Sequence, residues 1–158
     1  MPTPLTPGQP APDFELESDN AGTVRLKDLR GKHVVLYFYP KDDTPGCTAE
    51  ACGLRDAIAH IEREGAVVLG VSLDSLKSHQ KFRQKFDLPF PLLSDPDHQV
   101  ADAYGVYGPK KFMGREYMGV DRATFLIDPE GKLAAVWPKV KPEGHAQEIL
   151  EWLRGRKA

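Results

Sequence analysis

Apolar runs and helical periodicity alternate along the first two thirds of the chain, and this alternation predicts strands and helices in turn. Wholly apolar runs bounded by turn-forming residues are typical of strands buried on both faces of a sheet. Such runs cover residues 34–39, 66–72 and 91–94. Between them, apolar side chains recur at helical spacing over about 47–64, before Gly65, and again over 75–86. The pattern therefore predicts a β-α-β-α order that ends in a short third strand.

The two ends of the chain carry the remaining predicted elements. Residues 1–12 are rich in proline and should be extended. Polar and apolar residues alternate on both sides of a turn at 19–22, which predicts an N-terminal β-hairpin, and a short helical turn should follow and stop at Gly31. Later in the chain we expect a helix over 98–104, a hairpin over 123–137, and a C-terminal helix whose inner face includes Ala146, Ile149, Leu150 and Leu153.

Length, charge and cysteine content limit the possible classes of protein. The chain has 158 residues, which suits a single domain over 1–158 with one sizeable core. A formal net charge of -2 gives no electrostatic reason to expect binding to nucleic acid or an anionic membrane. No apolar segment is long enough to cross a membrane, and the first residues lack the features of a signal peptide. We therefore expect a cytoplasmic setting, where the two cysteines are more typical of catalysis than of a structural disulfide.

The turn before the first long helix is suited to activating a cysteine. Thr44 is a good N-cap residue, and Pro45 then takes the first helical position, where its missing N–H costs nothing. Gly46 allows a close approach of the backbone to a bound molecule. Cys47 falls on the third helical position, where unpaired N–H groups and the helix dipole favour a negative charge. The position therefore predicts a reactive thiolate, although a small buried hydrophobic side chain is the ordinary alternative.

The spacing of the two cysteines is informative in itself. Cys47 begins the core-facing stripe of the helix, whereas Cys52 falls on the other face, near Arg55, Asp56 and Arg63. Five residues along an ideal helix turn through about 140° and separate Cα atoms by about 8–9 Å. A disulfide requires Cα atoms within roughly 7 Å. A bond between these two cysteines therefore needs the first turns of the helix to unwind, which fits an attacking and resolving pair rather than a structural staple.

The residues around Cys47 resemble the active-site signature of the peroxiredoxins. The signature is Pro40-x-x-x-Thr44-x-x-Cys47. Four further stretches resemble the peroxiredoxin Q, or bacterioferritin comigratory protein, subfamily; they cover 38–41, 44–48, 51–56 and 124–128. The resemblance extends over nearly the whole chain. It implies an α/β, thioredoxin-like fold with a central mixed β-sheet flanked by helices and an N-terminal β-hairpin.

The resemblance also implies the activity and the residues that perform it. The chain should be a thiol-dependent peroxidase that reduces hydrogen peroxide and organic hydroperoxides, with Cys47 as the peroxidatic and Cys52 as the resolving cysteine. Thr44 should position the peroxide and hydrogen-bond the sulfur, Pro40 should shield the site, and Arg122 should steady the thiolate. Thioredoxin or a similar dithiol should reduce the resulting disulfide. The subfamily favours a monomer, and no metal or organic cofactor is implied.

Several residues remain open on the sequence alone. The segment 105–119 holds glycines, basic residues and aromatics; it could frame the site or contact a reductant, but a surface loop is the commoner case. Without the resemblance, Arg122 would be an ordinary surface arginine. Glu50 and Asp43 could tune the site, but we expect them on an exposed face, and His79 should be a packed helix residue. The histidines show no metal-binding spacing.

Two other functions are compatible with the fold and need different evidence. A thiol–disulfide exchange protein would reduce protein disulfides and ignore peroxide, but the sequence lacks the C-x-x-C spacing of such proteins. A non-enzymatic binding module would keep its activity after loss of both thiols. Nothing in the sequence favours that module.

Overall fold

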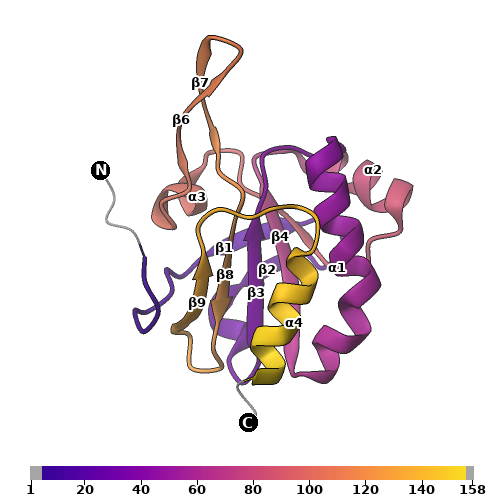
Figure 1. Cartoon of the computed structure of the whole chain (residues 1–158), viewed down its shortest axis with the longest axis vertical. Helices are drawn as coiled ribbons and strands as arrows, with labels where there is room; N and C mark the ends of the chain where they lie inside the picture. The colour runs from indigo at the N-terminus through magenta and orange to yellow at the C-terminus, as the bar shows by residue number, and fades with distance from the viewer. Residues whose placement is uncertain (1–4, 156–158) are drawn as a thin grey trace.

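A mixed β-sheet forms the centre of the protein in the computed structural model, which describes residues 5–155 apart from the side chain of Phe112. Across this part of the chain the main sheet has seven strands, in the order β2-β1-β5-β4-β3-β8-β9. Their bounds are β1 Glu15–Ser18, β2 Thr23–Arg25, β3 His33–Phe38, β4 Ala66–Ser72, β5 Leu92–Ser94, β8 Ala123–Ile127 and β9 Leu133–Trp137. Strands β3, β4 and β5 are parallel, and the others pair antiparallel (Figure 1). The predicted mixed sheet and N-terminal hairpin are confirmed.

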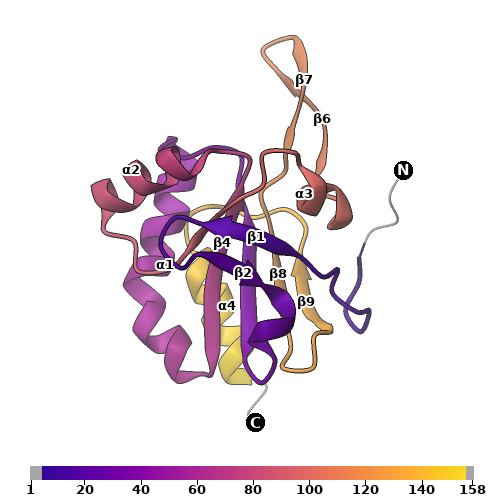
Figure 2. The same cartoon turned by 180° about the vertical axis from the view of Figure 1, so that it is seen from behind.

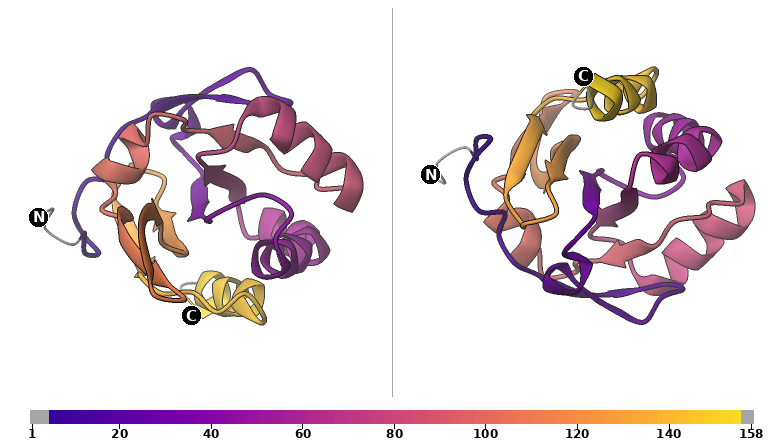
Figure 3. Two further views of the ribbon diagram at one scale, coloured as in Figure 1. Left: turned by 90° about the horizontal axis from the view of Figure 1, so that it is seen from above. Right: turned by 90° about the horizontal axis from the view of Figure 1, so that it is seen from below.

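Helices and loops cover the two faces of this sheet. The α-helices are α1 Pro45–Arg63, α2 Leu76–Phe86, α3 Gln99–Ala103 and α4 His145–Gly155, and a 3₁₀ helix, η1, spans Leu26–Leu29. Helices α1 and α4 lie side by side on one face (Figures 2 and 3). The hairpin β1–β2, which extends the twisted sheet beyond β5, lies on the opposite side (Figure 2). Side chains of β3 alternate between the faces: Val35 and Tyr37 join the core under α1, and Val34 and Leu36 join the core under η1 and α3.

The junction between β3 and α1 brings the first cysteine to the carboxyl edge of the sheet. Every residue of β3 is buried, because β4 and β8 flank it in the sheet and both of its faces are covered. The chain then crosses six connecting residues, 39–44, and enters α1 with Pro45 in its first turn. Open α/β sheets bind their ligands at this edge. The fold therefore places Cys47 where a substrate has access to the end of a central strand.

The segment 105–119 is a β-hairpin rather than the surface loop predicted as the commoner case. Strands β6 Tyr107–Phe112 and β7 Arg115–Val120 form a separate two-stranded sheet that projects from the body (Figure 1). A two-residue turn, Met113–Gly114, joins them with φ angles of 52° and 79°. Both positive angles are typical of a type I′ hairpin turn. The strands escaped prediction because they contain glycine, proline and lysine, which are poor strand formers.

The other predicted elements agree with the structure to within a few residues. The last hairpin, the C-terminal helix and the short turn before Gly31 are all present. Residues 1–4 of the predicted extended N-terminus lie outside the described residues, and 5–12 hold no strand, although Pro10 bridges to Lys132. Across residues 5–155, no helix combines the length and apolar character needed to cross a membrane.

Candidate active site

The start of α1 has the predicted arrangement, with one change at Thr44. Thr44 is the N-cap residue in extended conformation, Pro45 opens the helix, and Cys47 is the third helical residue. The Thr44 hydroxyl makes no capping bond to the helix, and it donates a hydrogen bond to the carbonyl of Lys41 at 2.9 Å. Its proton is therefore directed away from the Cys47 sulfur, contrary to the bond expected there. The oxygen of Thr44 is left with lone pairs that can accept a hydrogen bond from a bound hydroperoxide.

Arg122 joins two buried acidic groups at the site. Its Nη2 lies 3.4 Å from Cys47 Sγ, and its Nη1 lies 2.9 Å from Glu50 Oε1. The Glu50 side chain is fully buried, and the Arg122 side chain is 17% exposed. Burial disfavours the charge of Arg122, but Cys47 and Glu50 outweigh that effect and raise the pKa of the guanidinium. A fixed positive charge is therefore held against the sulfur.

Glu50 is buried, so the expectation of an exposed helix face is wrong for this residue. It lies one turn after Cys47, on the inner face of α1. Burial raises the pKa of Glu50 to about 7, although the charge and hydrogen bond of Arg122 oppose the shift. Glu50 Oε2 has no hydrogen-bond partner among the described residues. Near neutral pH the Glu50 carboxyl is therefore protonated in some molecules and ionised in others. When it is ionised, its negative charge competes with the Cys47 sulfur for the positive charge of Arg122.

Gly46 is required by the close approach of Arg122 to the first turn of the helix. A Cβ atom added at Gly46 would lie 2.8 Å from Arg122 Nη2 and 3.4 Å from Cγ of Pro142. Real Cβ contacts of 2.8 Å essentially never occur. The absence of a side chain at this position lets the guanidinium reach Cys47 across the start of α1.

A cluster of buried polar groups fixes the loop between β3 and α1. The Asp42 carboxylate accepts hydrogen bonds from the hydroxyls of Tyr39 at 2.6 Å and Ser78 at 2.8 Å, and it lies 2.7 Å from Nδ1 of His79. The backbone N–H of Asp42 donates to Asp74 Oδ2 at 2.8 Å. His79 is wholly buried, as the prediction of a packed residue required. The loop that leads to Cys47 is thus tied to α2.

Cys52 lies away from the Arg122 contact. It is half-buried, whereas Cys47 is buried, and both are free thiols. The pKa of Arg55 is raised first by its hydrogen bond to Asp56 and further by Cys52, which confirms that Arg55 lies near Cys52. Both cysteines belong to the continuous helix α1. A disulfide between them therefore requires local unwinding, as the spacing predicted.

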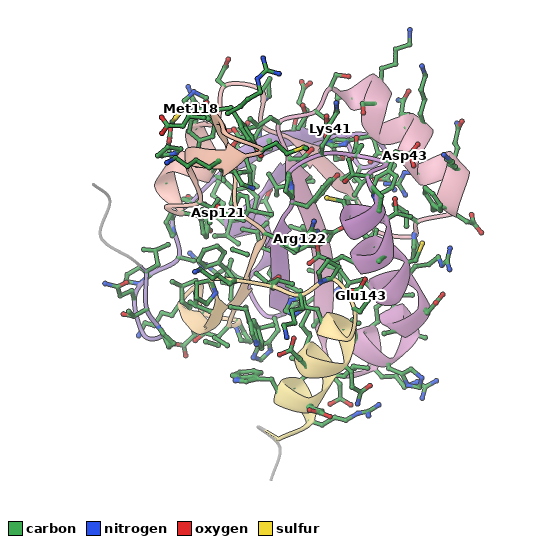
Figure 4. All side chains as sticks on the ribbon, turned by 45° about the horizontal axis from the view of Figure 1, so that its top comes forward. Lys41, Asp43, Met118, Asp121, Arg122 and Glu143 are labelled. Atoms are coloured by element: carbon green, nitrogen blue, oxygen red, sulfur yellow. The ribbon has the colours of Figure 1, made fainter. Side chains whose placement is uncertain are left out.

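The remaining predicted site residues also lie on this edge of the sheet. Pro40 is the second residue after β3 and is half-buried. Asp43, labelled in Figure 4, is exposed, as expected. It pairs with Lys85 at 2.9 Å. Within residues 5–155, no three histidine, cysteine or acidic side chains are grouped as metal ligands would be. Sequence analysis named Glu50 as a residue that could tune the site but expected it to be exposed, although its position three residues after Cys47 was the available signal for burial.

Comparisons with known proteins agree with this geometry. The AhpC/TSA family profile matches residues 7–136. The putative peroxiredoxin bcp of Coxiella burnetii is 56% identical over 143 residues, covering 90% of this chain and 95% of that protein. Peroxiredoxin Bcp of Escherichia coli K12 is 45% identical over 151 residues, covering 96% and 97%.

Solved structures give the same result for the fold. The bacterioferritin comigratory protein of Xanthomonas campestris, whose structure was studied for alkyl peroxide reduction, has a TM-score of 0.86 and 38% identity, with 92% of each chain covered. A cysteine-to-serine mutant of Xylella fastidiosa PrxQ has a TM-score of 0.92 and 34% identity, with 100% of each covered. The thioredoxin-like fold is confirmed. The chain belongs to the AhpC/TSA family, within its peroxiredoxins of the Bcp and Q type.

Proposed function

We propose that this chain is a two-cysteine peroxidase in which Cys47 attacks hydroperoxides and Cys52 resolves the product. The observation that carries the proposal is the Arg122 guanidinium 3.4 Å from the buried Cys47 sulfur at a helix N-terminus. This arrangement stabilises a thiolate, which is the nucleophilic form of cysteine. Peroxidase activity is also the property of the family to which the chain belongs.

The first step transfers one oxygen atom to sulfur. The Cys47 thiolate attacks the terminal oxygen of ROOH, the O–O bond breaks, and the RO⁻ leaving group takes a proton to become ROH. Cys47 becomes a sulfenic acid. Arg122 and the unpaired N–H groups of the first helical turn stabilise the developing charge, and Thr44 orients the peroxide by accepting a hydrogen bond from it. Pro40, at the end of β3, limits the access of water.

The second step closes a disulfide. After the first turns of α1 unwind, the Cys52 thiolate attacks the Cys47 sulfur and the hydroxyl leaves as water. An external dithiol then reduces the disulfide by exchange and is itself oxidised. We propose thioredoxin or a similar small dithiol protein as this reductant, a monomer as the active form, and the reducing cytoplasm as the location. The family membership supports a thiol reductant in general.

Substitution of each cysteine tests the two roles separately. Cys47→Ser should abolish peroxide consumption. Cys52→Ser should consume one equivalent of peroxide and then stop in a thioredoxin-linked assay, because no disulfide forms. Sustained turnover by Cys52→Ser with thioredoxin would show that Cys52 is not the resolving cysteine.

A further inference from the structure

The Asp42 cluster connects α2, the residues before it and β5 to the loop that must move during disulfide formation. Ser78 and His79 belong to α2, Asp74 lies before α2, and Nε2 of His79 lies 2.9 Å from the carbonyl oxygen of Leu93 in β5. The Asp42 side chain is 4% exposed and that of His79 is 0% exposed. The loop is therefore held by buried polar contacts to α2 and, through His79, to β5.

Both ring nitrogens of His79 have buried partners. The carbonyl of Leu93 can only accept a hydrogen bond, so Nε2 carries a proton. Nδ1 lies 2.7 Å from the Asp42 carboxylate, which also accepts from the hydroxyls of Tyr39 and Ser78, and 3.5 Å from the Tyr39 oxygen. His79 and Asp42 therefore form a buried hydrogen-bonded pair. Burial lowers the pKa of His79, but the hydrogen bond and charge of Asp42 outweigh it, and the net shift is upward.

Other contacts of the same loop are weaker. The Lys85–Asp43 pair is 60% and 45% exposed at its two side chains, and exposed pairs contribute little to stability. The Thr44 hydroxyl bonds only within the loop itself, to Lys41. Among the side-chain contacts that fix the β3–α1 loop itself, the Asp42 cluster is therefore the most buried.

We propose that His79 is a positioning residue for the resolving step: with Asp42 it latches the β3–α1 loop closed, and release of this latch controls how readily Cys47 reaches Cys52. The inference rests on the proposed function. In the closed state Cys47 stays beside Arg122 for attack on peroxide. In the open state the sulfenic acid of Cys47 meets the Cys52 thiolate, the S–S bond forms, and hydroxide leaves as water.

The latch also sets a competition between two fates of the sulfenic acid. While the loop stays closed, a second hydroperoxide can oxidise Cys47 to sulfinic acid and release a second ROH. A weaker latch shortens the time spent closed. It should therefore speed disulfide formation and raise the peroxide concentration needed to inactivate the enzyme.

Two variants and one matched control test the latch in the full chain. His79→Gln keeps an amide donor near the Nε2 position but loses the contact with Asp42. Ser78→Ala removes a single hydrogen bond and serves if His79→Gln folds poorly. Lys85→Gln is the control, because it breaks an exposed pair between the same loop and the same helix. Hydrogen–deuterium exchange of the reduced proteins measures opening, and stopped-flow fluorescence with hydrogen peroxide measures the oxidation and resolving phases.

The expected result is local. Exchange over residues 40–52 and the resolving rate should rise at least about tenfold in His79→Gln and about threefold in Ser78→Ala, since hydrogen bonds to charged groups are the stronger ones. Exchange in α4 should stay unchanged, and Lys85→Gln should differ from the wild type by less than about twofold.

Two results would overturn the latch. In one, both variants match Lys85→Gln in exchange and resolving rate. In the other, exchange rises equally throughout the protein, which marks a general structural role. Failure of the proposed function is distinguishable, because the wild type would then show no peroxide-dependent phase. In that case hydrogen–deuterium exchange of the reduced proteins would still show whether His79 holds the loop.

Discussion

Substitution of Glu50 by glutamine tests the electrostatic account of the site through stability. In the wild type the folded environment raises the pKa of Glu50 from 4.5 to about 7, with burial as the main cause. A glutamine has nearly the same shape and can still accept the hydrogen bond of Arg122, but it carries no charge at any pH. The variant therefore isolates the effect of ionising a buried carboxyl.

The sign and size of the effect follow from proton binding. Between pH 4.5 and 7 the folded state holds a proton that the unfolded state has released, so stability falls as pH rises through this window. One pKa unit corresponds to about 1.4 kcal/mol, which gives a loss of about 3 kcal/mol across the window. Solvent screens this carboxyl little, because the Glu50 side chain is 0% exposed. The free energy of unfolding of Glu50→Gln, relative to that of the wild type, should therefore be about 3 kcal/mol more favourable to the folded state at pH 8 than at pH 4.

Urea unfolding under reducing conditions measures this difference. The fluorescence of Trp137 and Trp152 reports unfolding, and the free energy is determined at several pH values from 4 to 8. Glu62→Gln is the matched control, because Glu62 is an exposed residue of the same helix. Its difference from the wild type should not vary with pH. A flat difference for Glu50→Gln over the same range would refute the reasoning.

Three further substitutions test other parts of the structure. Arg122→Lys should lower the second-order rate with hydrogen peroxide about a hundredfold in stopped flow, because one ammonium cannot contact both Cys47 and Glu50; a fall of less than threefold would contradict this. Gly46→Ala should also slow that rate while circular dichroism shows a folded protein, since its Cβ displaces the guanidinium; an unchanged rate would exclude the close approach. Burial lowers the pKa of His145, so the folded protein loses stability as pH falls below 6.5. Between pH 7 and pH 5 the free energy of urea unfolding should therefore fall less in His145→Gln than in the wild type, and an equal fall would argue against the shift.

Local patterns were sufficient to predict the main sheet and the geometry of the first cysteine. Strand β3 is apolar on both faces and is buried on both faces, so its prediction needed no tertiary information. The order Thr44-Pro45-Gly46-Cys47 defines a helix start through local chemistry alone. The angle between Cys47 and Cys52 follows from helix geometry. These features agree because each depends on neighbours in the chain.

Features that depend on distant segments were not predictable from the pattern. The burial of Glu50 arises because Arg122, distant in sequence, supplies its partner. The Asp42 cluster brings together residues that are 37 positions apart at its His79 contact. The hairpin β6–β7 depends on a Met113–Gly114 turn, which lacks the asparagine or aspartate that usually marks a type I′ turn. Only the resemblance to peroxiredoxins directed attention to Arg122.

The most direct test of the central claim is the reaction of the reduced protein with one equivalent of hydrogen peroxide. Stopped-flow fluorescence, thiol counting and intact mass should be followed together. The account predicts a fast reaction that removes both thiols, lowers the mass by about two daltons, and is absent in Cys47→Ser. A reaction no faster than that of a free thiol would contradict it.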